Sequence, residues 1–189
     1  MAERTIKTGW PALLALALAA LNSPGGFTGE TASSTPATRV DFANDLIPVF
    51  TKAGCNAASC HGAAIGRGGF KLSLYGGNPE ADYEAIVRQV EGRRVNLARP
   101  EESLIVLKPT KQIAHRGGRR LVDGKEGAEL LLRWIRQGAG LISSRSLDRV
   151  EISPGRHVAE KPGASIELRA TAFFSDGSKQ DVTRWTVFT

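Results

Sequence analysis

The sequence contains little sulfur. Of its 189 residues only two are cysteines and one is a methionine, and that methionine is Met1. The body of the chain therefore offers no thioether to a metal ion. Long apolar runs are also scarce, since outside the N-terminal region no stretch is apolar enough to cross a membrane as a helix. The content of 41% apolar and 23% charged residues nevertheless excludes a wholly disordered or collagen-like chain.

The charge balance is modest and excludes little. Lysine and arginine number 25 against 19 acidic residues, which gives a formal net charge of +6. This bias is compatible with a nucleic acid, an anionic membrane or an acidic protein partner, and it selects none of them. The length allows one core of about 100 residues with additional segments.

The N-terminal region has the pattern of an export signal. Arg4 and Lys7 precede an apolar run over residues 10–21, which is too short to span a bilayer as an ordinary helix. An amphipathic or core helix is the alternative, but the run has no polar face and a Pro-Gly-Gly turn follows it. We therefore predict a signal peptide and flexible spacer over residues 1–38, and an exported protein, periplasmic or at the cell surface. An uncleaved signal would serve as a membrane tether.

Four helices are predicted in the next 100 or so residues, from apolar spacing and capping residues. Pro48 should end or kink the first of them. Gly138 follows the last of them, where it would form the C-terminal cap. The predicted helices cover residues 41–52, 79–90, 100–107 and 125–137.

The C-terminal region changes to a strand pattern. Apolar and polar residues alternate over residues 149–152, 165–174 and 184–188, and turn sequences separate these stretches. The spacing is typical of a β-sandwich, but the residues available suffice for only three or four strands where a sandwich needs about seven. We expect the chain to be the N-terminal part of something longer, or a truncated gene product, with exposed strand edges at its C-terminus.

Both cysteines lie in one short motif, Cys55-Asn-Ala-Ala-Ser-Cys60-His61. In an exported protein two cysteines commonly form a disulfide, which is one interpretation. A second is covalent haem attachment, in which two thiols bind the porphyrin edge and the adjacent imidazole binds the iron. The usual spacer is two residues, and here it is four. A zinc site is a third interpretation, although it would need a fourth ligand.

The stretch over residues 40–139 resembles the cytochrome c-like domain at the N-terminus of large secreted planctomycete proteins. The resemblance rests on DFANDLIPVF, CNAASCHGAAIGRGGFKLSLYGG, RRVN, PEESLIVLKPT, HRGGRRL and LLRWIRQGA. The tail from Leu147 onward is similar to the group 2 bacterial immunoglobulin-like domain. Together these matches imply a fold that is mainly α, a cytochrome c-like helical domain followed by a truncated β-sandwich (Ig-like) segment. The implied domains are a cytochrome c-like haem domain over 39–141 and a partial bacterial Ig-like domain over 146–189.

A low-spin haem iron needs a second axial ligand, and the chain has no methionine to supply it. His115 follows the attachment motif at a distance where cytochromes place their distal ligand, so we expect His61 and His115 to bind the iron. The alternative is an exposed loop histidine, with an iron that is five-coordinate or binds water. His157, in the C-terminal region, is expected to be an ordinary turn residue.

Basic residues crowd around His115, and two more arginines lie upstream. They could pair with the haem propionates, dock an acidic redox partner or bind a polyanion. We predict propionate pairing from among Arg93, Arg94 and Arg119, and docking of an acidic redox protein by the rest. Nucleic acid is not expected, because no series of stacking aromatics accompanies the charges. The other basic residues are Lys108, Lys111, Arg116 and Arg120.

These expectations combine into one function. We predict an exported c-type cytochrome domain that binds one covalent haem c and transfers electrons, a carrier rather than an enzyme. One alternative is a cell-surface adhesion or carbohydrate-interaction module with a structural Cys55–Cys60 disulfide. Another is a haem-based sensor of a small ligand. The Ig-like segment is expected to contact cell-surface material.

Overall fold

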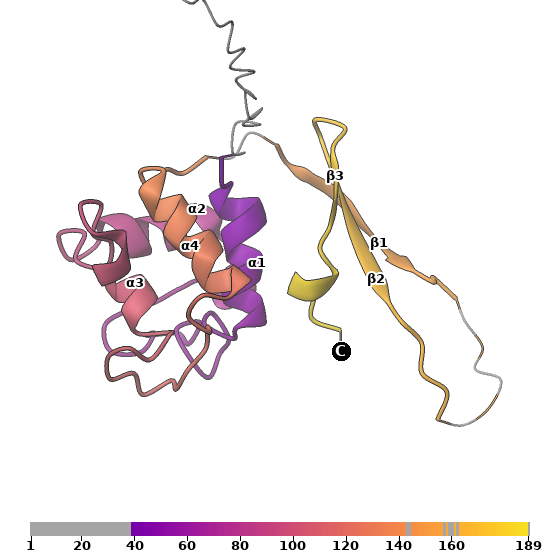
Figure 1. Ribbon diagram of the computed structural model, residues 1–189, viewed down its shortest axis with the longest axis horizontal. Helices are drawn as coiled ribbons and strands as arrows, with labels where there is room; N and C mark the ends of the chain where they lie inside the picture. The colour runs from indigo at the N-terminus through magenta and orange to yellow at the C-terminus, as the bar shows by residue number, and fades with distance from the viewer. Residues whose placement is uncertain (1–38, 143–144, 157, 159–160, 162, 189) are drawn as a thin grey trace, which may run out of the picture. The chain divides into compact units, whose positions relative to one another are not determined.

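The computed structural model describes residues 39–142, 145–156, 158, 161 and 163–188 (Figure 1). We call residues 39–142 the helical part and residues 145–188 the sheet part. The predicted signal peptide and spacer, residues 1–38, lie outside the described residues. Among the helices that the structure describes, none is long and apolar enough to span a membrane.

The first predicted helix is present and has two sections. A wide π-helical stretch, η1 (Phe42–Leu46), leads into α1 (Ile47–Lys52). Asp41 begins it as the N-cap, since its carboxylate accepts a hydrogen bond from the backbone N–H of Asn44. Pro48 does not end the helix. It lies just after the change from π to α geometry, so the irregularity that a proline introduces coincides with a change in the helix rather than with its end.

The second helix is shorter than predicted. It consists of α2 (Pro79–Tyr83) and a π-helical stretch, η3 (Glu84–Arg88). Asn78 caps it as expected by accepting from the N–H of Ala81. Val90 was predicted to lie on this helix, but its φ of 55° is left-handed and its side chain is 54% exposed. The helix therefore ends before Val90.

The third predicted helix is interrupted, whereas the fourth agrees closely with the sequence. A single 3₁₀ turn, η4 (Pro100–Glu102), precedes α3 (Leu104–Leu107), and Ser103 between them has extended backbone. The longest helix is α4 (Glu126–Arg136), and Gly138 follows it with a φ of 94°. That left-handed conformation is one that glycine adopts without strain, which explains the helix end. A further 3₁₀ turn, η2 (Leu74–Gly76), precedes α2.

Aromatic rings from three helical segments meet in the core of the helical part. The ring centroids of Phe42 and Trp134 are 5.3 Å apart, and those of Phe42 and Tyr83 are 5.5 Å apart. The Trp134 indole N–H donates to the carbonyl of Gly140 at 2.9 Å, so the buried ring has no unpaired donor. The apolar faces predicted for the first and last helices are buried here. This core supports the loops that surround the site.

The sheet part is an antiparallel meander of three strands. The strands are β1 (Leu147–Ser153), β2 (Arg169–Phe174) and β3 (Lys179–Asp181), in the order β1-β2-β3 (Figure 1). The first predicted strand is confirmed, and the second is confirmed from Arg169 onward. β3 carries no apolar alternation, which is why the sequence did not indicate it.

The strand predicted over residues 184–188 is wrong. The 3₁₀ turn η5 (Thr183–Trp185) occupies its start. Asp181 initiates this turn by accepting from the N–H of Thr183 at 2.9 Å, and the Thr183 hydroxyl accepts from the N–H of Ala170 at 2.9 Å. These side-chain bonds divert the backbone from a strand.

The predicted mainly α fold class is wrong. The described residues contain four short α-helices and one three-stranded sheet, with 31% helical and 12% strand content. In addition, the strands described form a single sheet, and a sandwich requires two packed sheets. The helical content is low because the helices are short and long glycine-rich loops join them. The domain boundaries at residues 141 and 146 stay predictions.

Candidate functional site

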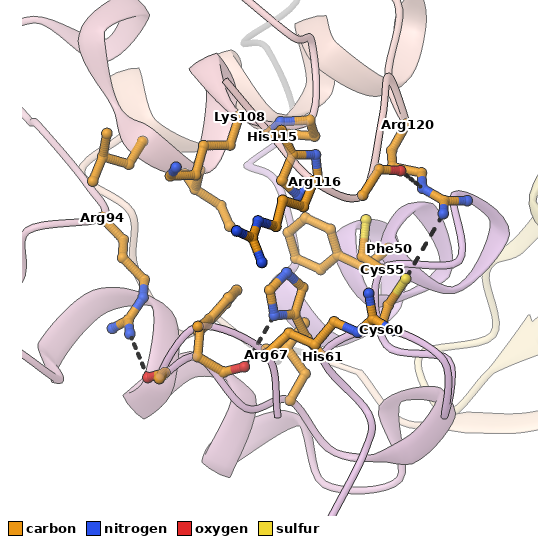
Figure 2. A pocket seen from close by; sticks show the side chains of 18 of the residues that line it. Phe50, Cys55, Cys60, His61, Arg67, Arg94, Lys108, His115, Arg116 and Arg120 are labelled. Carbon is orange, nitrogen blue, oxygen red and sulfur yellow. Dashed lines mark hydrogen bonds between the residues drawn. The ribbon is translucent and has the colours of Figure 1, made fainter. Parts of the chain in front are cut away.

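A cavity of about 1160 Å³ lies within the helical part. Small-molecule and cofactor sites typically measure about 300–1,000 Å³, so this cavity has room for a large ligand. Its apolar lining residues are Phe50, Phe70, Leu72, Val90, Leu104 and Ile105. Its basic lining residues are Arg67, Arg93, Arg94, Lys108, Lys111, Arg116 and Arg120. The cavity is also lined by the residues that the sequence predicts to attach a haem and bind its iron, Cys55, Cys60, His61 and His115 (Figure 2).

The cysteine motif folds into a compact turn directly after α1. The backbone N–H of His61 donates to the carbonyl of Cys55 at 3.0 Å and so closes the turn. The next residue has to be small, because a Cβ atom at Gly62 would lie 2.0 Å from the carbonyl oxygen of Asn56. Cys55 and Cys60 are free thiols, and both line the cavity. The four-residue spacer therefore still brings both sulfurs to one cavity.

His61 is held in one orientation by a backbone carbonyl. Its Nδ1 lies 2.9 Å from the carbonyl oxygen of Phe70. A carbonyl oxygen only accepts, so Nδ1 carries the proton and Nε2 presents a lone pair. Burial is the main cause that lowers the pKa of His61 from its usual 6.5; the hydrogen bond to the Phe70 carbonyl opposes this effect, and the positive charge of Arg94 adds to it. The imidazole is therefore predominantly neutral near pH 7, the form that binds metal ions.

His115 has the same arrangement on the other wall of the cavity. Its Nδ1 lies 2.8 Å from the carbonyl oxygen of Gly118. The loop bends at Gly118, whose φ is 77°, and this bend brings the carbonyl back onto the ring. Gly117 packs against the imidazole so closely that a Cβ atom there would lie 2.7 Å from Cε1. Metal-binding histidines usually donate their second N–H to a carbonyl or carboxylate in this way.

The two imidazoles line the same cavity with their planes nearly parallel. Their ring centroids are 6.4 Å apart and their planes differ by 10° (Figure 2). A metal ion lies about 2.0–2.1 Å from a coordinating imidazole nitrogen, and this nitrogen lies about 1.1 Å from the ring centre. Two imidazoles on opposite sides of one ion would therefore have centroids about 6.3 Å apart.

The thiols lie in an apolar environment with one nearby cation. Burial raises the pKa of the Cys55 thiol to about 11, and the Arg120 charge opposes that rise. The Arg120 guanidinium also reaches Cys60, with Nη2 3.8 Å from Sγ. Cys55 is therefore a protonated thiol near neutral pH, and the sulfur of Cys60 lies within reach of a positive charge. The sequence did not single out Arg120 as a residue that contacts the cysteine motif.

The arginines predicted to bind a cofactor are placed differently from one another. Arg93 and Arg94 line the cavity, whereas Arg119 is exposed and does not. Arg94 is largely engaged by the protein itself. Its guanidinium donates to the carbonyls of Ala85 and Gln89 at 2.8 and 3.2 Å, and to Gly69 at 3.2 Å. It also lies 4.5 Å from the centre of the Phe70 ring. Arg94 thus fastens the loop that orients His61.

The donor set fits a porphyrin better than a bare metal ion. Within the ranges that the structure describes, no group of three or more His, Cys, Asp or Glu side chains could hold a metal ion. A structural zinc ion needs four protein ligands, and the two imidazoles supply only two of them. A haem brings four nitrogen ligands of its own, so His61 and His115 would complete the ligands of its iron. The size of the cavity and the two thiols at its wall are compatible with this group.

The remaining histidine, His157, was predicted to be a turn residue and lies outside the described residues. Sequence reasoning also missed Arg67, which lines the cavity, and the two carbonyls that orient the imidazoles. The only signal for these carbonyls was the clustering of glycines after each histidine. Comparisons of the chain with protein-family models, with curated proteins and with solved structures found no match.

Proposed function

We propose that this protein is a c-type cytochrome that attaches one haem covalently and carries single electrons. The observation that carries the proposal is the pair of parallel imidazoles whose centroids are 6.4 Å apart. Both Nδ1 atoms lie within hydrogen-bond distance of carbonyls, so in each ring Nε2 is the nitrogen that would bind the iron. This preparation of both rings is what a bis-histidine iron site needs.

The cysteine motif would hold the porphyrin edge. The thiols of Cys55 and Cys60 line the same cavity as His61, so these two residues would hold the porphyrin by thioether bonds and the adjacent imidazole would bind its iron. Apolar side chains such as Leu72 and Ile105 would cover the porphyrin faces and limit the access of water. A dry site stabilises the protein against loss of the group and tunes its potential.

The axial ligands determine the redox behaviour. The iron supplies a one-electron couple between its ferric and ferrous states when the haem is bound. Imidazole from His115 in place of a thioether should give a lower potential than a His/Met site, because methionine ligation raises the potential. We therefore propose a low-potential carrier.

The cavity mouth should attract negative charge. The described lining includes seven lysines and arginines and no aspartate or glutamate. One or two of these residues, with Arg93 the leading choice, would pair with the haem propionates. The others would steer an acidic redox protein, an interaction that should weaken as salt screens the charges.

We also propose that the protein works outside the cytoplasm. This rests on the N-terminal signal pattern and on the resemblance to secreted planctomycete proteins with a cytochrome c-like domain. In that setting the donor and acceptor would be other exported or surface-bound redox proteins.

A visible spectrum tests the main proposal. The full chain is produced together with a haem-attachment system, and its absorption is recorded before and after acid–acetone extraction. We expect a Soret band and a sharp α-band on reduction, with the haem retained by the protein after extraction. The double variant Cys55→Ser/Cys60→Ser is the control and should release any haem on extraction. A colourless wild-type protein would contradict the proposal.

A further inference from the structure

Arg120 spans two segments that are sixty residues apart in sequence. Its Nε donates to the carbonyl of Gly117 at 2.7 Å, and its Nη2 lies 3.8 Å from the sulfur of Cys60 (Figure 2). The first contact belongs to the loop that carries His115, and the second belongs to the cysteine turn that carries His61. One side chain thus joins the two walls of the cavity.

The His115 loop behaves as a unit because its internal bonds tie the imidazole to the backbone. The N–H of Gly118 donates to the carbonyl of His115 at 3.0 Å, and the His115 ring bonds back to the carbonyl of Gly118. At the end of the loop the backbone N–H of Arg120 donates to the carbonyl of Pro109 at 2.7 Å. A restraint on Gly117 therefore also restrains the His115 ring.

We propose that Arg120 is a positioning residue that holds the His115 loop against the haem-attachment turn. Its consequence at the iron rests on the function proposed above. Without the bridge, His115 would leave its position opposite His61 more often. A porphyrin attached at Cys60 would then bind His115 through its iron for a smaller fraction of the time.

The geometry requires a guanidinium rather than a positive charge alone. Arginine presents five N–H donors on a rigid planar fork, so it can contact an oxygen and a sulfur in different directions at once. Lysine has a single nitrogen on a flexible stem, so it could contact the Gly117 carbonyl or the Cys60 sulfur but not hold both in this arrangement. Thioether formation removes the S–H of Cys60 but leaves a sulfur that is still a weak acceptor. The bridge can therefore persist after attachment.

The test uses the full chain with its haem, in the wild type and in Arg120→Ala and Arg120→Lys. The matched control is Arg119→Ala, which removes the same charge from the neighbouring exposed residue that does not line the cavity. The probe is carbon monoxide, which must displace His115 from the ferrous iron before it can bind. Its apparent affinity therefore measures how often the imidazole leaves.

We expect about a tenfold increase in carbon monoxide affinity for Arg120→Ala, the effect of losing one hydrogen bond from a charged donor. Arg120→Lys should show a similar increase, and Arg119→Ala should match the wild type. A second control, Ile135→Val in the buried core, should lower the thermal midpoint without changing this affinity.

The outcomes separate this inference from the function on which it rests. A wild-type protein that takes up no covalent haem contradicts both. A loaded wild type with unchanged affinity in Arg120→Ala overturns the positioning role alone. Full recovery by Arg120→Lys would overturn the bridge in favour of a simple charge effect. Loss of attached haem in Arg120→Ala but not in Arg120→Lys would also overturn the bridge, because a positive charge alone would then be enough.

Discussion

The helical part and the sheet part use their residues differently. In the helical part, buried side chains from separate helices support loops whose carbonyls orient two histidines. In the sheet part, every residue of β1 is exposed, and the buried apolar residues are Ala170, Ala172 and Phe174. One part is held together mainly by side-chain packing and the other mainly by its backbone ladder. The comparison indicates that functional side chains carried on loops keep their positions because a packed core lies beneath those loops.

The largest effect expected is at the iron. Replacing His115→Ala should convert the spectrum of the loaded protein from low spin to high spin, since one strong axial ligand is lost. Arg149→Ala in β1 removes an exposed ion pair with Glu151 and should leave the spectrum unchanged. Visible absorption of the ferric protein measures both. A spectral change in Arg149→Ala would show that the sheet part also influences the iron site, contrary to this comparison.

The next largest effect concerns stability. Trp134→Ala removes a side chain that is 1% exposed, and it should lower the free energy of unfolding by about 3–5 kcal/mol. Val150→Ala in β1 removes part of a side chain that is 45% exposed and should cost no more than about 1 kcal/mol. Urea denaturation of both variants gives the comparison. Equal losses would show that the sheet part is packed as firmly as the helical part.

A smaller effect is expected from a single methyl group. In Gly117→Ala the new Cβ atom would lie 2.7 Å from Cε1 of His115, so the imidazole must shift. We expect a partial rise in the high-spin fraction and a loss of stability of about 1–3 kcal/mol. Gly138→Ala is the control for a helix-end glycine with no atom within 4 Å of the added Cβ. That control should lose stability, because its φ is 94°, without any change in spin state.

The smallest effect is a pH dependence in the haem-free protein. Because the pKa of His61 is lower in the folded state than its usual 6.5, the unfolded state binds a proton first as the pH falls. The contribution of His61 to stability is therefore complete above pH 6.5 and is lost as the pH falls through its lower, folded-state pKa. Urea denaturation at about pH 7.5 and about pH 5.5 should show lower stability at the acidic pH. His61→Gln should reduce that difference, and an unchanged difference would contradict this assignment.

Part of the site could be predicted from the sequence because it is local. Cys55, Cys60 and His61 lie within one seven-residue motif that forms a turn, so their shared cavity follows from a few backbone bonds. Helix caps such as Asp41 and Asn78 are local for the same reason. The prediction that His115 belongs to this site rested on its distance along the chain and on resemblance. Its orientation depended on a glycine turn that no spacing rule describes.

The fold class could not be predicted correctly because helix lengths depend on their packing. Val90 continues an apolar pattern, yet tertiary context ends that helix early and leaves Val90 at the cavity. The strand expected after Arg184 failed because Asp181 and Thr183 form side-chain bonds that start a 3₁₀ turn. Alternation alone does not reveal such competition between side chains and the backbone ladder.

The sequence by itself determined which atoms are available: two thiols and one imidazole in a single turn, a second histidine in a basic loop, and no thioether beyond Met1. The tertiary structure decided how these atoms are used. It brought two imidazoles from distant segments to 6.4 Å, turned both Nδ1 atoms toward carbonyls and placed Arg120 between the two walls. The physical reason is that composition and spacing act along the chain, whereas the distance between two loops is fixed by the core that packs beneath them.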